Sequence, residues 1–251
     1  MKIVVAGATG ALGSCVMDAV RIAGHEPVPI SRSSGVDLMT GAGLAPALAG
    51  ATAVIDASAT STTSTKQFVD FFGTVTRNLL AAERAAEVPH HVAISIIGAA
   101  KVNANYYAGK AAQEQILQAV GGGWSLLRTT QFHDFAKQLV GHGKVGPWQV
   151  VPTMRSQPIA ATEVATELVA IACGEPRGLE PDLAGPREEN MADLVRRYLA
   201  AIGRSRPVIQ VPLPGAWGRS MRDGTLLPAR GTRRARVTFD EWLTTQSGPT
   251  S

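Results

Sequence analysis

The chain has 251 residues, of which 45% are hydrophobic and 18% charged, a composition that can fill the core of one α/β domain. It contains no run of eighteen apolar residues and no signal-peptide pattern, so we expect a cytoplasmic protein without a membrane partner. Eight arginines and three acids lie in residues 204–251, but no aromatic interleaving or DNA-reading motif accompanies them, so we expect a solvated surface and no nucleic-acid partner.

The first thirteen residues join a strand pattern to a glycine-rich turn. Ile3–Ala6 is an apolar, β-rich run, and glycines follow it at a spacing of three before a helical pattern begins. This order is typical of a dinucleotide site in a doubly wound parallel sheet, although a plain strand–helix turn is the alternative. We expect the first glycine to permit the turn, the second to admit a pyrophosphate, and the third to allow close helix packing. The predicted contacts are Gly7, Ala8, Thr9, Gly10, Ala11, Leu12 and Gly13.

The second strand, Pro27–Ile30, ends in Ser31, Arg32 and Ser33, where the ribose of an adenosine would lie. An acidic residue there would bond the 2′-hydroxyl and repel a 2′-phosphate. Arginine between two hydroxyls suits a phosphate. We therefore expect these three residues to bind NADP(H) in preference to NAD(H), with NAD(H) possible; the alternative is that Arg32 points to solvent.

Two further strands and a loop are predicted before the first long helix. Residues 36–38 resemble a short third strand that contains Asp37, which can also act as a simple cap. Residues 53–58 predict a buried strand on which Ala57 would lie against the cofactor, and Ser58 follows it. Residues 58–65 are small and hydroxyl-bearing, and we expect a loop. A helix over residues 66–87 ends before Pro89.

The next segment carries candidate chemistry. A fifth strand over 91–95 ends at Ser95, and Tyr106 and Lys110 are four residues apart, so a helix places them on one face. We expect the ammonium to lower the pKa of the phenol and Tyr106 to exchange a proton beside a carbonyl or hydroxyl. A packing tyrosine and a surface lysine are the alternatives. His90 and His91 make a poor metal pair, and no metal site is expected.

The remainder of the chain alternates short strands and helices. Residues 108–120 predict a helix, 124–128 a sixth strand, 149–152 a short strand, and 207–212 a late strand added to the sheet. Asn190 and Thr238 are expected helix caps, and residues 244–251 a frayed end. We expect a single NAD(P)-binding domain over 1–251, with a Rossmann core over 1–146. Residues 147–251 would supply late strands and a small substrate cover.

Together, the glycine spacing, Ser95–Gly98, Tyr106 with Lys110, and Arg128–Phe132 resemble the atypical short-chain dehydrogenase/reductases, the NmrA-like and NAD(P)H-binding group. The resemblance extends from Met1 to about Leu243. It implies a catalytic set of Ser95, Tyr106 and Lys110, with Lys110 also holding the cofactor ribose. It further implies cofactor contacts at Asp37, Leu38 and Thr130, and a substrate pocket at Gln131 and Phe132. His133 is either a second acid/base or a capping or surface residue.

Two positions depart from the pattern of extended members. Asp70 stands where Asn is frequent, which puts a proton relay in doubt, and Thr129 stands where epimerases often have Pro. We therefore expect an NADP(H)-dependent oxidoreductase that reduces a small organic carbonyl or enone. The alternative is a non-catalytic NADP(H)-binding redox sensor, and a sugar-nucleotide epimerase ranks last. The substrate and the choice between monomer and homodimer stay open.

Overall fold

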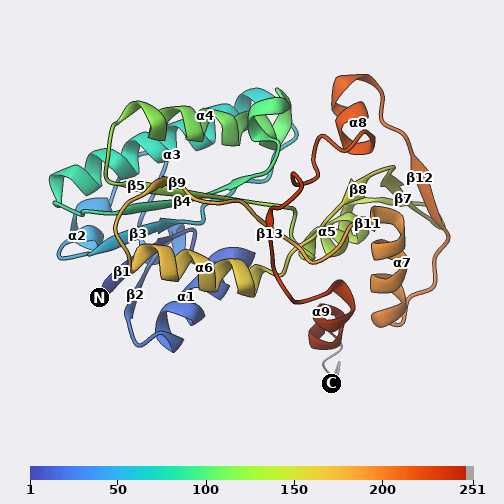
Figure 1. Cartoon of the computed structure of the whole chain (residues 1–251), viewed down its shortest axis with the longest axis horizontal. Coiled ribbons are helices and arrows are strands. Elements are labelled where there is room, and N and C mark those ends of the chain that lie inside the picture. The colour runs from blue at the N-terminus through green and yellow to red at the C-terminus, as the bar shows by residue number, and fades with distance from the viewer. Residues whose placement is uncertain (247–251) are drawn as a thin grey trace. The chain divides into compact units, whose positions relative to one another are not determined.

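The computed structural model describes residues 1–246, which form two compact units. Unit 1 comprises Met1–Arg128 and Val164–Pro181, and unit 2 comprises Thr129–Glu163 and the chain from Asp182 onward (Figure 1). The boundary that we expected after residue 146 lies inside unit 2. The expected frayed end is wrong for residues 244–246, which are helical, and its residues 247–251 lie outside the described part of the chain.

Unit 1 is built on a parallel sheet with the strand order β5-β4-β3-β1-β2, and a short β9 lies beside β5. The expected doubly wound α/β fold is confirmed. The strands are β1 (Lys2–Ala6), β2 (Glu26–Ile30), β3 (Ala53–Asp56), β4 (His91–Ile96), β5 (Trp124–Thr129) and β9 (Gly178–Leu179). Because these strands run in parallel, their carboxyl ends meet at one edge of the sheet.

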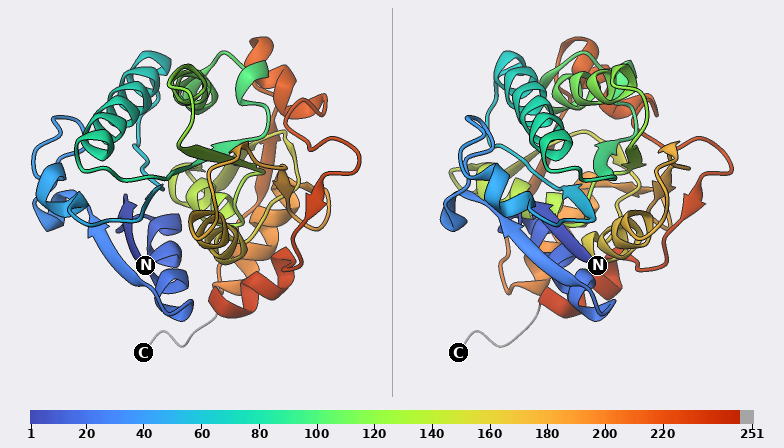
Figure 2. Two further views of the ribbon diagram at one scale, coloured as in Figure 1. Left: turned by 60° about the vertical axis from the view of Figure 1, so that its left-hand side comes forward. Right: turned by 90° about the vertical axis from the view of Figure 1, so that its left-hand side faces the viewer.

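Helices cover both faces of this sheet. In Figure 1, α3 and α4 lie on one face and α1 and α6 on the other, and both views of Figure 2 show α3 and α4 side by side. The helices of this unit are α1 (Ala11–Ile22), η1 (Arg32–Ser34), α2 (Leu44–Leu48), α3 (Thr65–Ala85), η2 (Ala99–Lys101), α4 (Asn105–Ala119) and α6 (Ala161–Ala172). No helix among residues 1–246 is long and apolar enough to span a bilayer.

The expected strand at residues 36–38 is wrong. This segment is a turn, in which one carboxylate oxygen of Asp37 accepts the N–H of Met39 at 2.8 Å and that of Thr40 at 3.4 Å. Gly35 and Gly41 on either side have φ values of 78°. A side-chain bond to the backbone two residues onward competes with extended pairing, so the capping alternative for Asp37 is the one observed.

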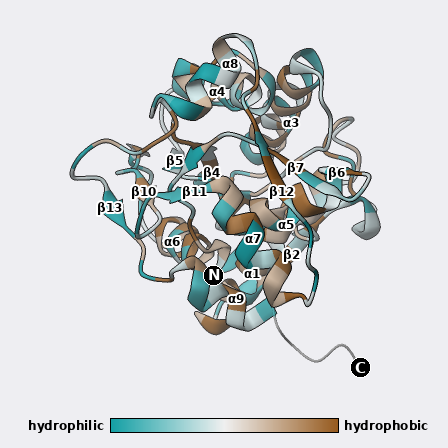
Figure 3. Ribbon diagram, turned by 90° about the vertical axis from the view of Figure 1, so that its right-hand side faces the viewer, coloured by the Kyte–Doolittle hydropathy of each residue, from teal (hydrophilic) through white to brown (hydrophobic). Residues whose placement is uncertain are grey.

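Unit 2 contains a separate three-stranded sheet. Val208–Val211 of β12 pairs in parallel with Gln149–Pro152 of β7, so the expectation that this late strand joins the main sheet is wrong. Figure 3 shows the apolar colour of β12. The strands of unit 2 are β6 (Lys144–Val145), β7 (Trp148–Pro152), β8 (Arg155–Ser156), β10 (Leu183–Ala184), β11 (Glu189–Asn190), β12 (Val208–Val211) and β13 (Arg233–Arg234).

Two helix caps in unit 2 are confirmed. The Asn190 side chain accepts the N–H of Ala192 at 2.9 Å, and Thr238 and Glu241 exchange the bonds of a capping box. The helices of unit 2 are α5 (Asp134–His142), α7 (Met191–Ala201), α8 (Gly215–Arg222) and α9 (Phe239–Gln246).

The first helix of unit 1 approaches the first strand as closely as the backbone allows. A Cβ atom built on Gly13 would lie 2.0 Å from the carbonyl oxygen of Gly7. Gly7 itself has a φ of 76°, and its added Cβ would lie 2.7 Å from the carbonyl oxygen of Ala57. Both glycines are therefore required by geometry, as we expected for the turn and for close packing.

We predict that Gly13→Ala lowers the free energy of unfolding by about 2–3 kcal/mol, because the new methyl group must displace backbone. Gly141→Ala is the matched control, since Gly141 is also helical and an added Cβ there meets nothing within 4 Å. It should be neutral or stabilising by up to about 1 kcal/mol. Urea denaturation measures both, and an undiminished stability of Gly13→Ala would contradict the packing.

The adjacent histidines that precede and begin β4 have separate partners. The imidazole of His90 lies 2.9 Å from the hydroxyl of Ser125, and that of His91 lies 2.8 Å from the carboxylate of Glu83 on α3. Burial by itself would lower the pKa of His91, but the charge and hydrogen bond of Glu83, with a further contribution from Asp56, raise it. The buried pair therefore favours the protonated imidazole.

A raised pKa in the folded state stabilises the protein most below the ordinary value near 6.5, and this stabilisation is lost as the pH rises through the folded-state pKa. We predict that Glu83→Gln, which removes the carboxylate, costs more unfolding free energy at pH 6 than at pH 9. Denaturation of both proteins at the two pH values measures the difference. An equal cost at both would show that His91 is neutral throughout.

Candidate cofactor and redox site

The turn after β1 presents open backbone. Thr9, Gly10 and Ala11 are exposed. The first helical hydrogen bond of α1 is the one that the Ser14 N–H donates to the Gly10 carbonyl at 2.9 Å. The N–H of Gly10 bonds the Gly7 carbonyl at 2.9 Å, whereas those of Ala11, Leu12 and Gly13 have no acceptor among residues 1–246, as in the first turn of any helix. No acidic side chain lies in that turn. An anion at this end of α1 would meet N–H donors and the positive end of the helix dipole.

The end of β3 lies directly beneath this turn. Ala57 donates its N–H to Ala6 at 3.0 Å, and a Cβ on Gly7 would come within 2.8 Å of the Cα of Ser58. The hydroxyl of Ser58 is buried and has no hydrogen-bond partner among the described residues. An orphaned hydroxyl beside an open glycine turn is what a polar ligand group would satisfy.

The end of β2 forms a serine-rich turn. The hydroxyls of Ser31 and Ser33 lie 2.8 Å apart, and Ser34 closes the turn onto the Ser31 carbonyl at 2.8 Å. Arg32 is exposed and forms no ion pair or side-chain hydrogen bond with another described residue. Gly7 donates its N–H to the carbonyl of Ile30 at 3.0 Å, so this turn adjoins the turn after β1, residues 7–13, which we call the glycine turn. The two turns therefore place the Arg32 guanidinium, which no carboxylate among residues 1–246 neutralises, beside the N–H groups at the start of α1.

Ser95 has a partner that we did not expect. Its hydroxyl donates to Glu114 at 2.6 Å, and the guanidinium of Arg128 forms two bonds with the same carboxylate, one of 2.9 Å. Ser95 is buried, and its only hydroxyl proton is directed at Glu114. Donation to a substrate oxygen would require that bond to break, so in this structure Ser95 supports an internal ion pair.

Lys110 is also internal, contrary to the surface alternative. It is 1% exposed, and its Nζ donates to the carbonyl of Ile94 and to Oε1 of Gln113, both at 2.9 Å. The same atom lies 4.1 Å from the centroid of the Phe72 ring. Burial lowers the pKa of Lys110 to about 8, although the charges of Asp56 and Glu114 oppose this. Its donors are occupied, and none reaches the surface.

Tyr106 is half-buried among aromatic rings. Its ring lies edge-on to Phe68 and Phe72, with centroid separations of 5.9 and 5.5 Å, and no hydrogen bond of its hydroxyl is found among residues 1–246. Burial, with a contribution from the Asp56 charge, raises the pKa of the phenol. The expectation that Lys110 lowers this pKa is wrong, because its Nζ lies 5.8 Å from the ring centroid and bonds elsewhere. Tyr106 is a protonated phenol.

Sequence reasoning missed three buried residues that organise this region: Asp56, Gln113 and Glu114. Gln113 bonds Lys110 through one amide atom and donates to Asp56 at 2.8 Å through the other. A signal was present, since Gln113 and Glu114 lie three and four residues after Lys110 on the predicted helix. An isolated polar residue at helical spacing is usually solvated, so the sequence by itself does not single them out.

A hollow of about 410 Å³ opens on unit 1 beside the Glu114–Arg128 pair. Its lining combines small apolar residues of the segment after β4 with amide side chains of α4. The residues are Ala99, Ala100, Val102, Asn103, Ala111, Glu114, Gln115, Gln118 and Arg128.

The other predicted pocket residues belong to unit 2 and have partners there. The hydroxyl of Thr130 accepts the N–H of Gly185 at 3.1 Å, and Gln131 accepts the hydroxyl of Ser156 at 3.2 Å. Phe132 forms a backbone bridge with Ile159. Of the two remaining predicted cofactor contacts, Asp37 caps its turn and Leu38 accepts a bond from Asn78 at 2.9 Å.

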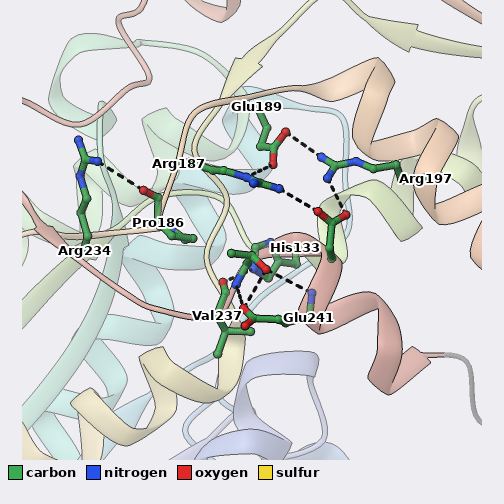
Figure 4. Close-up of polar contacts among 10 residues, drawn as sticks. His133, Pro186, Arg187, Glu189, Arg197, Arg234, Val237 and Glu241 are labelled. Carbon is green, nitrogen blue, oxygen red and sulfur yellow. Dashed lines mark hydrogen bonds and ion pairs between the residues drawn. The ribbon is translucent and has the colours of Figure 1, made fainter.

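His133 is an anchor for the end of unit 2. Its Nε2 lies 3.1 Å from the carbonyl of Val237 (Figure 4). Its ring centroid lies 5.5 Å from that of Phe239. Burial lowers the pKa of His133, although the Val237 carbonyl opposes this, so the ring is neutral with its proton on Nε2. Neither the expected side-chain cap nor the expected surface role is observed, since no cap bond forms and the residue is 1% exposed.

Figure 4 also shows a network of ion pairs in the same part of unit 2. Arg187 and Arg197 each bond both Glu189 and Asp240, at 2.7–2.8 Å. These four side chains carry no net charge. Arginines of this part of the chain are therefore not all available to an anion.

The parallel sheet with its open glycine turn defines a nucleotide-binding α/β protein. A family model described as NAD(P)H-binding matches residues 7–173, which is more than half of the chain. The protein therefore belongs to this NAD(P)H-binding family. Among curated protein sequences, none matches this chain significantly.

Solved structures share the fold at low sequence identity. A short-chain dehydrogenase/reductase superfamily protein from Agrobacterium tumefaciens with bound NAD is 18% identical, with a TM-score of 0.69 over 98% of this chain and 96% of that one. A nucleoside-diphosphate-sugar epimerase from Pseudomonas aeruginosa is 22% identical, with a TM-score of 0.70 over 97% and 95%. UDP-glucose 4-epimerase from Bifidobacterium longum, with NAD+ and UDP, is 14% identical, with a TM-score of 0.73 over 98% and 97%.

Proposed function

We propose that the protein is an NADP(H)-dependent oxidoreductase that reduces a small organic carbonyl or enone. The observation that carries the proposal is the uncovered glycine turn at the start of α1, with its unsatisfied N–H groups and the orphaned Ser58 hydroxyl beneath it. Family membership supports a nicotinamide cofactor at this turn. When bound, the nicotinamide supplies a hydride.

The preference for the phosphorylated cofactor rests on the end of β2. Among residues 1–246, Arg32 has no acidic partner, and Ser31 and Ser33, whose hydroxyls bond each other, flank it. A 2′-phosphate would gain charge-assisted hydrogen bonds there, whereas a 2′-hydroxyl would gain little from a cation. Arg32 therefore determines the choice of cofactor.

We predict that Arg32→Glu raises the Kd of NADPH about a hundredfold, because an attractive pair becomes a repulsive one, and changes the Kd of NADH less than about threefold. The control is Arg77→Glu, the same charge change at an exposed site on α3. Fluorescence titration of the reduced nicotinamide measures both constants. An unchanged Kd of NADPH in Arg32→Glu would contradict the assignment of Arg32 to the 2′-phosphate.

The proton for the reduced substrate comes from Tyr106 in this proposal. Its phenol is protonated, and its hydroxyl is not committed to another described residue. As hydride adds to the carbonyl carbon, negative charge develops on the oxygen, which is a far stronger base than a phenolate. Tyr106 donates its proton to that oxygen and is later reprotonated from solvent. The buried ammonium of Lys110, whose Nζ lies 5.8 Å from the centroid of the Tyr106 ring, supplies a positive charge at a fixed position.

We predict that Tyr106→Phe lowers NADPH-dependent turnover by about 10²- to 10⁴-fold, since general acid catalysis is lost, while the Kd of NADPH is unchanged. Tyr107→Phe is the matched control on the same helix, because Tyr107 is 4% exposed and does not face solvent. It should retain most of the activity. Full turnover in Tyr106→Phe with an accepted substrate would exclude this donor.

One observation favours the redox-sensor alternative. Ser95 directs its proton to Glu114 and Lys110 is fully enclosed, so neither holds a substrate oxygen in this structure. A sensor would bind NADPH without oxidising it. Chain length does not exclude an epimerase either, since the Pseudomonas aeruginosa epimerase has 95% of its chain covered.

Incubation with NADPH and a panel of small ketones, aldehydes and enones separates these readings. Net oxidation, followed at 340 nm, is the result expected for a reductase. Tight binding without oxidation supports the sensor. Interconversion of nucleotide sugars without net change of the cofactor would instead support an epimerase.

A further inference from the structure

Asp56 is a buried carboxylate that none of the sequence motifs includes. It is 0% exposed and ends β3, and its two oxygens accept different donors. One oxygen accepts the backbone N–H of Ser58 at 2.9 Å, and the other accepts Nε2 of Gln113 at 2.8 Å. Since Ser58 lies beneath Gly7, the first bond fixes the floor of the glycine turn.

Gln113 carries the contact onward to Lys110. Its Oε1 accepts from Nζ of Lys110 at 2.9 Å, so one amide lies between a buried cation and a buried anion. An amide offers an acceptor to the ammonium and a donor to the carboxylate at once. A methionine there would leave both charges without this bond, and a glutamate would place a second negative charge beside Asp56.

The chain of contacts ends beside Tyr106. The Phe72 ring lies 4.1 Å from the Lys110 Nζ, and its centroid lies 5.5 Å from that of Tyr106. The Asp56 charge acts on both groups, because it favours the ammonium of Lys110 and disfavours ionisation of the phenol. The same carboxylate therefore biases both groups toward their protonated forms.

We propose that Asp56 and Gln113 are positioning residues of the redox site. Through the Gln113 amide, the Asp56 carboxylate holds Lys110 as an ammonium beside Tyr106, and through Ser58 it ties this pair to the glycine turn. The inference rests on the proposed function for its catalytic consequence, but the retention of a charged Lys110 does not depend on turnover.

Other charged groups near Lys110 are already committed. Glu114, on the same helix, is paired with Arg128 and accepts the Ser95 hydroxyl. From α3, the group that faces Lys110 is the uncharged Phe72 ring, and from β4 it is the carbonyl of Ile94. Asp56 is thus the carboxylate that the amide links to this ammonium.

The test is Asp56→Asn, which keeps the size of the side chain and removes its charge. The pKa of Lys110 is followed by NMR of the full chain labelled with ¹³Cε-lysine, with Lys110→Met used to assign the signal. We expect its titration midpoint to fall well below the wild-type value of about 8, so that the protonated fraction at pH 8 drops roughly tenfold. Asp18→Asn, at an exposed surface pair on α1, should leave the midpoint in place.

Gln113→Met is the second variant, and it keeps the test valid if Asp56→Asn does not fold. Loss of the amide bond should also lower the Lys110 midpoint while Asp56 is retained. Circular dichroism and NADPH titration confirm that each variant is folded. A midpoint equal to that of the wild type in a folded Asp56→Asn or Gln113→Met protein would overturn the proposal.

Measurement of turnover separates a failure of this proposal from a failure of the proposed reductase function. With a carbonyl substrate that the wild type reduces, we expect the pH at which kcat falls to move downward together with the Lys110 midpoint, and KM for NADPH to change little. If the midpoint shifts but no carbonyl or enone is reduced even by the wild type, the positioning role stands and the proposed reductase function fails. If turnover occurs but the pH dependence of kcat does not shift with the Lys110 midpoint, Asp56 and Gln113 do not act on catalysis through Lys110.

Discussion

The close approach of α1 to the turn after β1 is the constraint on which the cofactor end of unit 1 depends. A side chain at Gly13 would occupy the position of the Gly7 carbonyl, so the helix can start here only where no Cβ exists. Gly7 in turn bonds Ile30 at the end of β2 and touches the segment after β3. One pair of glycines thus brings three strand ends together, and the positive end of the helix dipole is directed at their meeting point.

Beneath α3 and α4, the charged residues of the interior occur in matched chains. Lys110 reaches Asp56 through Gln113, Arg128 pairs with Glu114, and Glu83 holds His91. Each arrangement replaces the hydration that burial removes, because an unpaired buried charge would cost several kcal/mol.

A consequence of this arrangement concerns the motif residues. Ser95 and Lys110 match the motif residues of the resembled family, yet here their polar atoms bond internal partners, whereas the hydroxyl of Tyr106 bonds no other residue among 1–246. The same residue types can thus serve chemistry or internal charge balance. Only their contacts distinguish the two.

Local patterns predicted the parts of the fold that are decided locally. Apolar runs located the strands of the parallel sheet, and the caps at Asn190 and Thr238 are set by residues within a few positions. The failures were of two kinds. Residues 36–38 have strand-forming character, but the Asp37 carboxylate closes a turn. Val208–Val211 is a strand as expected, but its partner was wrong, since pairing depends on segments sixty residues away.

The sequence by itself determined the parallel α/β class, the glycine turn and the family, because these depend on spacing along the chain and on the absence of side chains. Only the tertiary structure decided how Ser95, Lys110 and Tyr106 behave. The pKa values of Lys110 and Tyr106 depend on burial and on the charge of Asp56 on β3, and the hydroxyl of Ser95 donates to Glu114 on α4. Proximity along a helix suggested a lysine that ionises a tyrosine, and the folded interior instead directs that lysine to an amide and a carbonyl.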